Sequence, residues 1–280
     1  MRTQHKELEY GFADKAWQVV TGCDNTIACW KNCWAARVVN RLSASPNAKV
    51  AAAHAGLVRV AGPAYNPVLA WTGVVRINEA HLEDPLKWRK PAVIATGFHG
   101  DWGLLSSIDK KRMFAVMERC EYHQFFPLTK HGLPEHALFL SEMALCRRVL
   151  PNVNIGVSVM EQDDADATLP HIRTIAAAGW KVHVWHEPAI GSVDWRGWEF
   201  LSWLIVGGQS AGDAPFDLQW ARNAIAWGNI NHVPIKIKQI GLHPVDGLRD
   251  ASHLVTDRRG ESWDTWPPGI KVRGMPEVVK

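Results

Sequence analysis

Long hydrophobic runs are missing from this 280-residue chain. No stretch approaches the roughly 20 apolar residues that cross a bilayer, and the polar start, Met1 to Asp14, has no apolar signal-peptide core. Low-complexity tracts, obvious linkers and fixed-period repeats are missing as well. These absences predict a soluble cytoplasmic protein that makes no membrane contact and keeps its cysteines reduced.

An excess of charge of one sign is also missing. The chain has 31 Lys and Arg residues and 28 Asp and Glu residues, so its net charge is only +3. Such a balance is weak support for a polyanionic partner. Hydrophobic residues make up 47% of the chain, which is enough for a sizeable core. Tryptophan is in excess, with 15 copies. Core packing is the simpler interpretation of these rings, and stacking on bases or on an adenine is the alternative.

Short β-rich runs alternate along the chain with longer amphipathic stretches, which predicts βα units around a parallel sheet. We expect an α/β fold, a partial or full (β/α) TIM-like barrel formed by one domain over residues 1–280, with extensions at 1–15 and 242–280. An open doubly wound sheet is the alternative. The expected strands are 17–21, 70–77, 92–96, 124–128, 153–159, 181–185, 203–206 and 235–240, and the expected helices are 32–42, 108–120, 135–150, 163–178 and 218–228.

A barrel of this kind carries its chemistry just past the C-terminal ends of its strands. Polar, ionisable or glycine residues lie at most of the predicted strand ends, which favours an enzyme site over a binding scaffold. The residues singled out there are His99, Asp101, Lys130, Ser158, His186, Glu187, Gly207, Gly208, Gln209 and Lys238. Of these, His99 and His186 are candidate proton carriers. Lys130 and Lys238 are candidate cationic partners for Glu187.

The stretch CDNTIACWKNCW, residues 23–34, lacks a fourth cysteine. Three cysteines are one too many for a single disulfide and one too few for a closed tetrahedral zinc site. Three thiolates on a four-iron cluster, however, leave one iron open. S-adenosylmethionine can chelate that iron, and electron transfer then yields a 5′-deoxyadenosyl radical. Zinc held with a distant histidine, and unligated thiols, are the alternatives. Cys120 and Cys146 fall in predicted helices, where small buried hydrophobic side chains are expected.

The segment WQVVTGCDNTIACWKNCWA, residues 17–35, resembles the opening of a phage- and prophage-encoded family of radical-SAM-like proteins of largely unassigned function. The resemblance continues in the same order over nearly the whole chain. Its further motifs are PLKWRKP (85–91), FAVM (114–117), LTK (128–130), GVSV (156–159), EP with GSVD (187–194), WLIVGG (203–208) and KQIG (238–241). Three departures are a middle cysteine placed one position earlier than in the family, Gln209 where the family has glutamate, and the stretch 97–102, which contains Asp101 and replaces the Ser-Asp-Leu-Phe of the family.

The resemblance implies a barrel of the radical SAM type with a [4Fe-4S] cluster and S-adenosyl-L-methionine. It implies Cys23, Cys29 and Cys33 as metal ligands. We expect cofactor-binding roles for Asp101, Ser158, Glu187, Gly207, Gly208, Gln209 and Lys238, and catalytic roles for His99, Lys130 and His186.

The family's phage setting favours modification or rearrangement of a nucleic-acid base, in particular pyrimidine hypermodification in phage DNA, by an enzyme whose class (isomerase, transferase or lyase) stays open. The expected partners are a DNA or nucleotide substrate and an external, flavodoxin-like electron donor in the host cytoplasm. The alternatives are a non-catalytic zinc or iron–sulfur module that binds nucleic acid, and a lyase that repairs damaged pyrimidines.

Overall fold

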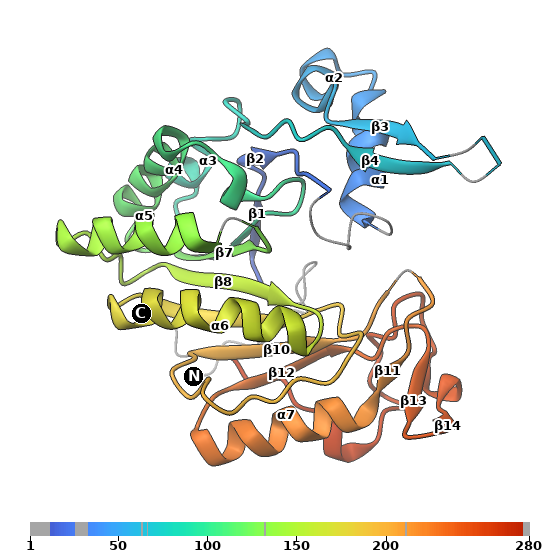
Figure 1. Cartoon of the computed structure of the whole chain (residues 1–280). Helices are drawn as coiled ribbons and strands as arrows, with labels where there is room; N and C mark the ends of the chain where they lie inside the picture. The colour runs from blue at the N-terminus through green and yellow to red at the C-terminus, as the bar shows by residue number, and fades with distance from the viewer. Residues whose placement is uncertain are drawn as a thin grey trace. The chain divides into compact units, whose positions relative to one another are not determined.

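The computed structural model describes residues 12–25, 33–62, 64–65, 67–131, 133–210 and 212–276. The fold is mixed α/β and separates into two compact units. The first consists mainly of residues 1–132 with 150–153, and the second of residues 133–149 with 154–279. In both units parallel strands alternate with helices (Figure 1), as the alternating sequence pattern predicts. The prediction of a single domain over the whole chain stays a prediction.

The first unit has a parallel sheet in the strand order β1-β6-β7, and two small antiparallel pairs, β2–β5 and β3–β4. Helices α1 and α2 pack beside the β3–β4 hairpin (Figure 1). Its elements are β1 Lys15–Trp17, β2 Val20–Thr21, α1 Trp34–Ser43, α2 Ala48–His54, β3 Val58–Ala61, β4 Val68–Trp71, β5 Arg76–Ile77, α3 Asp84–Lys87, β6 Val93–Thr96, α4 Ser107–Arg119 and β7 Gln124–Thr129.

The second unit has a parallel sheet in the order β8-β9-β10-β12 and a small sheet in the order β11-β13-β14. Helix α7 packs on β10 and β12, and α5 packs on α6. Its elements are α5 Leu133–Leu145, β8 Asn154–Val159, α6 Gln162–Ala177, β9 Lys181–His186, β10 Trp203–Gly207, β11 Phe216–Asp217, α7 Leu218–Asn231, β12 Ile235–Gln239, β13 Pro244–Asp246 and β14 Arg249–Asp250.

The central strands are buried along their whole length, which explains why the sequence reads as continuous apolar runs there. Every residue of β6, β8 and β10 is buried, with the sequences VIAT, NIGVSV and WLIVG. Parallel strands covered on both faces have this composition. The six strands predicted from 92–96 onward are therefore confirmed within a residue or two. The helices that follow them are confirmed as well, although the one predicted at 135–150 ends at Leu145 and the one predicted at 218–228 continues to Asn231.

Two predicted strands are wrong in detail. The segment 70–77 is two short strands, because Gly73 adopts a φ of +84° between β4 and β5. Neither half joins a parallel sheet, since β4 pairs with β3 and β5 pairs with β2, both antiparallel. The segment 17–21 is likewise divided, with β1 ending at Trp17 and β2 beginning at Val20.

The chain near the C-terminus pairs with β12. Ile237 N donates to Val272 O at 2.8 Å, and Gly274 N donates to Ile235 O at 2.7 Å. The side chain of Trp203 adds a third link, since its Nε1 donates to Gly274 O at 2.9 Å. Part of the predicted extension at 242–280 therefore covers a sheet edge in the second unit.

Candidate functional site

The backbone before Cys23 passes the loop after β6 at very short range. Gly22 N donates to His99 O at 3.0 Å, and Asp101 N donates to Gly22 O at 3.0 Å, as a parallel bridge between Gly22 and Gly100. A Cβ on Gly100 would lie 2.7 Å from Gly22 O, and Gly22 itself has a φ of +96°. Glycine is required at both positions, and the crossing places Cys23 beside the loop that carries Asp101.

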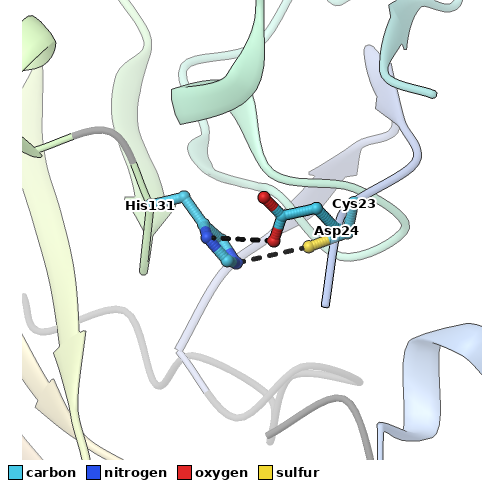
Figure 2. Close-up of side chains that lie close together, drawn as sticks. All are labelled: Cys23, Asp24 and His131. Carbon is cyan, nitrogen blue, oxygen red and sulfur yellow. Dashed lines mark hydrogen bonds and ion pairs between the residues drawn. The ribbon is translucent and has the colours of Figure 1, made fainter. Parts of the chain in front are cut away.

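Cys23, Asp24 and His131 form a compact group of three different donor types in the first unit (Figure 2). The Cys23 Sγ lies 3.5 Å from His131 Nε2, and Asp24 Oδ1 lies 3.3 Å from His131 Nδ1. The three ligand atoms all lie within 4.8 Å of one another. Thiolate, imidazole and carboxylate are the ligand types that zinc accepts. The arrangement is also that of a catalytic triad, in which Cys23 would be the thiol nucleophile, His131 its base and Asp24 the carboxylate that orients the base.

The position of His131 depends on the buried carboxylate of Asp101. Thr129 Oγ1 donates to that carboxylate and accepts from His131 N at 3.0 Å. Asp101 also accepts from Lys130 N and Gly103 N, each at 2.9 Å. Burial raises the pKa of the Asp101 carboxyl, while His131 and these donors act in the opposite direction. Both oxygens already accept from the chain, so Asp101 organises this loop, and its predicted cofactor role stays a prediction.

The two outer cysteines of the motif are held by one hydrophobic cluster. Cys33 is the N-cap residue of α1 and makes no side-chain cap hydrogen bond. Cys23 and Cys33 are both partly buried free thiols, and Cys29 lies outside the described residues. Both described thiols pack against the cluster formed by Ala35, Ala36, Val39, Leu57 and Trp71.

The remaining two cysteines differ from each other. Cys120 follows α4 directly and is fully buried, which confirms that it is a small core residue. Burial raises the pKa of its thiol. Cys146 follows the end of α5 and is exposed, so the prediction of a buried helical residue is wrong there. It is a suitable control for experiments on the thiols of the motif.

His99 and Lys130 were both predicted as catalytic residues. The His99 ring lies 5.6 Å from that of His54, and burial together with this neighbour lowers the pKa of His99 to about 4. A histidine with that pKa is neutral at pH 7. Lys130 is half-buried, and its backbone N–H donates a hydrogen bond to the Asp101 carboxylate. A catalytic role for either side chain stays a prediction.

In the second unit, Glu187 follows β9 and forms an ion pair with Lys238 on β12, which is separated from β9 by β10. Lys238 Nζ lies 2.5 Å from Glu187 Oε1, and Gln239 Nε2 donates to the same oxygen at 3.0 Å. Of the two lysines predicted as partners of this carboxylate, Lys238 is the one in the ion pair. Ser158 Oγ donates to the backbone oxygen of Glu187 at 2.9 Å, which fixes the strand end.

The stretch Gly207-Gly208-Gln209 packs closely against other residues of the second unit. A Cβ on Gly208 would lie 2.8 Å from the backbone of Ile240, so this glycine permits a close backbone approach. A Cβ on Gly207 would lie 3.4 Å from the Glu187 side chain. The side chain of Gln209 accepts from Ala214 N at 3.1 Å and fastens its own loop. Roles for these residues in holding a cofactor stay predictions.

His186 is buried beneath the same strand end. Its Nε2–H donates to Met160 O at 3.1 Å and to Gly191 O at 3.0 Å. Burial lowers the pKa of His186 to about 4. Its ring packs against Trp195 and Trp220, with centroids at 5.6 and 6.5 Å. This environment is typical of a neutral structural histidine, and a role as a proton carrier stays a prediction.

Most tryptophans serve packing. Among the tryptophans within the described residues, nine are buried, which agrees with the simpler interpretation of their abundance. Trp34 is 50% exposed at the start of α1, next to Cys33. The buried ones are Trp17, Trp71, Trp102, Trp180, Trp185, Trp195, Trp198, Trp203 and Trp266.

Sequence reasoning did not select Asp24 or His131 as site residues. His131 directly follows the LTK segment at the end of β7, so its position after a strand was the available signal. The 108-residue separation from Cys23 concealed the contact. Asp24 could have been found only through its neighbour, Cys23.

Within the described ranges, no helix is both long and apolar enough to span a membrane. Comparison with known proteins gives no match among curated proteins and none among solved structures. A family model described as "Protein of unknown function (DUF5131)" matches residues 7–267. Since this match covers nearly the whole chain, the protein belongs to the DUF5131 family.

Proposed function

We propose that this protein is a radical S-adenosylmethionine enzyme that modifies or rearranges a pyrimidine base of DNA or of a nucleotide. The observation that carries the proposal is the placement of the two outer motif cysteines. Cys23 follows β2, Cys33 begins α1, and the two free thiols pack on one hydrophobic cluster. Thiolates are the usual ligands of iron–sulfur clusters, and three of them leave one iron for a cofactor.

The donor set fits such a cluster. Cys23 and Cys33 are partly buried and form no disulfide, so the sulfur atoms of both can serve as ligands. Cys29, between them in the sequence, is the proposed third ligand. When bound, the cluster supplies the electron that cleaves S-adenosylmethionine to a 5′-deoxyadenosyl radical. The chain's own contribution is to orient Cys23 through the Gly22–Gly100 crossing.

The strand-end residues of the second unit are the proposed ligand-binding groups. Glu187 and Lys238 offer charged groups, while Ser158 fixes the backbone at Glu187. A barrel of the radical SAM type, a phage setting, a cytoplasmic location and a flavodoxin-like electron donor belong to the same proposal. They rest on the sequence resemblance.

Anaerobic reconstitution followed by iron and sulfide analysis tests the cluster. We expect a brown protein with about four irons and four sulfides per chain. The variants Cys23→Ala and Cys33→Ala should lose most of this iron. The exposed Cys146→Ala should retain it and serves as the matched control. Stoichiometric zinc without sulfide in the wild-type protein would sink the proposal.

A second candidate function is a zinc-containing module that binds nucleic acid without catalysis. The specific observation in its favour is the Cys23–Asp24–His131 group, whose ligand atoms lie within 4.8 Å of one another. The variant His131→Asn separates the two functions. It removes a ligand of the zinc site and should release zinc, whereas a cluster held by three thiolates should keep its iron and sulfide.

A further inference from the structure

Among the residues that the structure describes, only one of the two carboxylate oxygens of Glu187 has hydrogen-bond donors. Oε1 accepts from both Lys238 Nζ and Gln239 Nε2. Oε2 is buried and has no hydrogen-bond partner among the residues that the structure describes. A buried acceptor without a donor is unfavourable by about 1–3 kcal/mol, and native proteins rarely leave one. This oxygen is therefore a binding position for a donor that the chain does not supply.

The charges around this oxygen indicate that the missing donor is neutral. The ammonium group of Lys238 already balances the Glu187 carboxylate. Lys236 lies two residues earlier on the same face of β12, and Arg273 is its bridge partner on the adjoining segment. Burial, Arg273 and Lys238 lower the pKa of Lys236 to about 8, while the carboxylates of Glu187 and Glu261 act in the opposite direction and leave one positive charge in excess among these five groups. A further ammonium group would add to this excess of positive charge at a partly buried position.

Lys238, beside Glu187 Oε1, also offers a hydrogen-bond donor to a ligand. Lys238 has three N–H bonds, of which one is directed to Glu187 Oε1, and its Nζ lies 5.3 Å from the centroid of the Trp185 ring. Gln239 Nε2 has no hydrogen left, because it donates to both Glu187 Oε1 and Gly208 O. The complementary ligand group thus has an N–H to give to Oε2 and, beside it, a carbonyl oxygen to accept from Nζ. Amides and imides have this edge.

We infer that Glu187 and Lys238 bind the uncharged amide or imide edge of a ligand. The ligand N–H donates to Glu187 Oε2, and Lys238 Nζ donates to the adjacent carbonyl oxygen. Both side chains are partly exposed, 23% for Lys238 and 13% for Glu187. The inference rests on the proposed function only in the choice of pyrimidine bases as the first ligands to test, since the imide edge of thymine consists of N3–H and a neighbouring carbonyl, O2 or O4.

Calorimetric binding to the Cys23→Ala chain tests this inference, because that chain cannot assemble the proposed cluster. Failure of the radical chemistry therefore leaves the result unaffected. The probes are thymidine, N3-methylthymidine, 2′-deoxycytidine, the simple carboxamide nicotinamide, and methylammonium as a charged donor. We expect thymidine to bind at least about tenfold more tightly than N3-methylthymidine, which lacks the imide N–H, since one hydrogen bond to a charged group has this value.

Glu187→Gln supplies a sharper readout than loss of binding. Lys238 and Gln239 both donate to Oε1, so the amide oxygen of the new side chain must face them. Its NH2 group then replaces the acceptor Oε2 with a donor. The preference should shift at least about tenfold from thymidine, with a donor at N3, toward 2′-deoxycytidine, which has an acceptor at N3 and keeps the neighbouring O2 as an acceptor for Lys238. Glu142→Gln, on the exposed face of α5, is the matched control and should preserve the wild-type preference.

Each result decides the question. Binding of nicotinamide alone, abolished by Glu187→Gln, supports the amide edge and identifies a carboxamide as its source. Equal affinities for thymidine and N3-methylthymidine, with no binding of nicotinamide, overturn the inference. So does binding of methylammonium that depends on Glu187, since that ligand is charged. A thermal melt of Glu187→Gln like that of the control verifies that the variant is folded.

Discussion

Replacing Gly22 by alanine should destabilise the first unit strongly, because the chain has no room for the added carbon. A Cβ there would lie 1.9 Å from Val74 O, which is backbone and cannot turn aside. The residue also has a φ of +96°. Gly73→Ala is the matched control, since Gly73 has a φ of +84° but no atom within 4 Å of the added carbon.

The expected magnitude follows from three contributions. The left-handed conformation costs alanine about 1 kcal/mol, and this contribution is common to both variants. Displacing the backbone by overpacking costs about 1–3 kcal/mol. The displacement also breaks the two hydrogen bonds that join Gly22 to His99 and Asp101, at about 1 kcal/mol each. Gly22→Ala should therefore lose about 4 kcal/mol or more, against about 1 kcal/mol for Gly73→Ala.

Urea unfolding followed by tryptophan fluorescence measures both variants, because Trp17 and Trp71 are buried in the first unit. Gly22→Ala should also bind less iron after reconstitution, since Cys23 is the next residue. A difference of less than about 1 kcal/mol between the two variants would refute the steric reasoning.

Three further predictions concern single side chains. Cys33→Ala should abolish reductive cleavage of S-adenosylmethionine to 5′-deoxyadenosine, measured by chromatography. Replacing the buried Cys120 by alanine should lower only the stability, by about 1–2 kcal/mol. Full cleavage by the Cys33→Ala variant would show that Cys33 is not a cluster ligand. Asp101→Asn should lose about 3 kcal/mol in urea unfolding, because an amide N–H must face one of the donors that now bind the carboxylate; unchanged stability would show that this group does not hold the loops. His186 has a folded pKa of about 4 against an ordinary 6.5, so the unfolded chain binds the proton first and stability falls as the pH drops from about 6.5 to 4. His186→Gln should remove roughly 3 kcal/mol of this pH dependence, and equal pH profiles in the two proteins would contradict the assignment.

The sequence was sufficient for the elements whose burial is uniform. Strands such as β8 and β10 are buried throughout and largely apolar, and each is followed by a recognisable turn or helix. The hairpin β3–β4 was missed because β3 is largely exposed and lacks a clear apolar pattern. Gly73 divided the predicted strand 70–77, since a φ of +84° cannot be inferred from composition alone.

The sequence alone predicted only those parts of the candidate site whose residues lie close together in the chain or directly follow a predicted strand. Cys23 and Cys33 belong to one short motif, and Glu187 follows an apolar strand. The contact between Cys23 and His131 requires that β7 end beside the loop crossed by Gly22, which is a property of strand pairing. The ion pair of Glu187 with Lys238 was anticipated as one of two options, and strand order in the second unit decided between them.

The pairing of Val272 and Gly274 with β12 also bears on self-association. These residues cover N–H and C=O groups of Ile235 and Ile237 that would otherwise form an open sheet edge. Open edges recruit strands from other molecules. A chain cut before Val272, by a protease or by design, would expose β12, an alternating strand with the sequence IKIKQ, with unpaired backbone groups. Such a chain should form intermolecular sheets and precipitate even though every residue of the candidate site remains present.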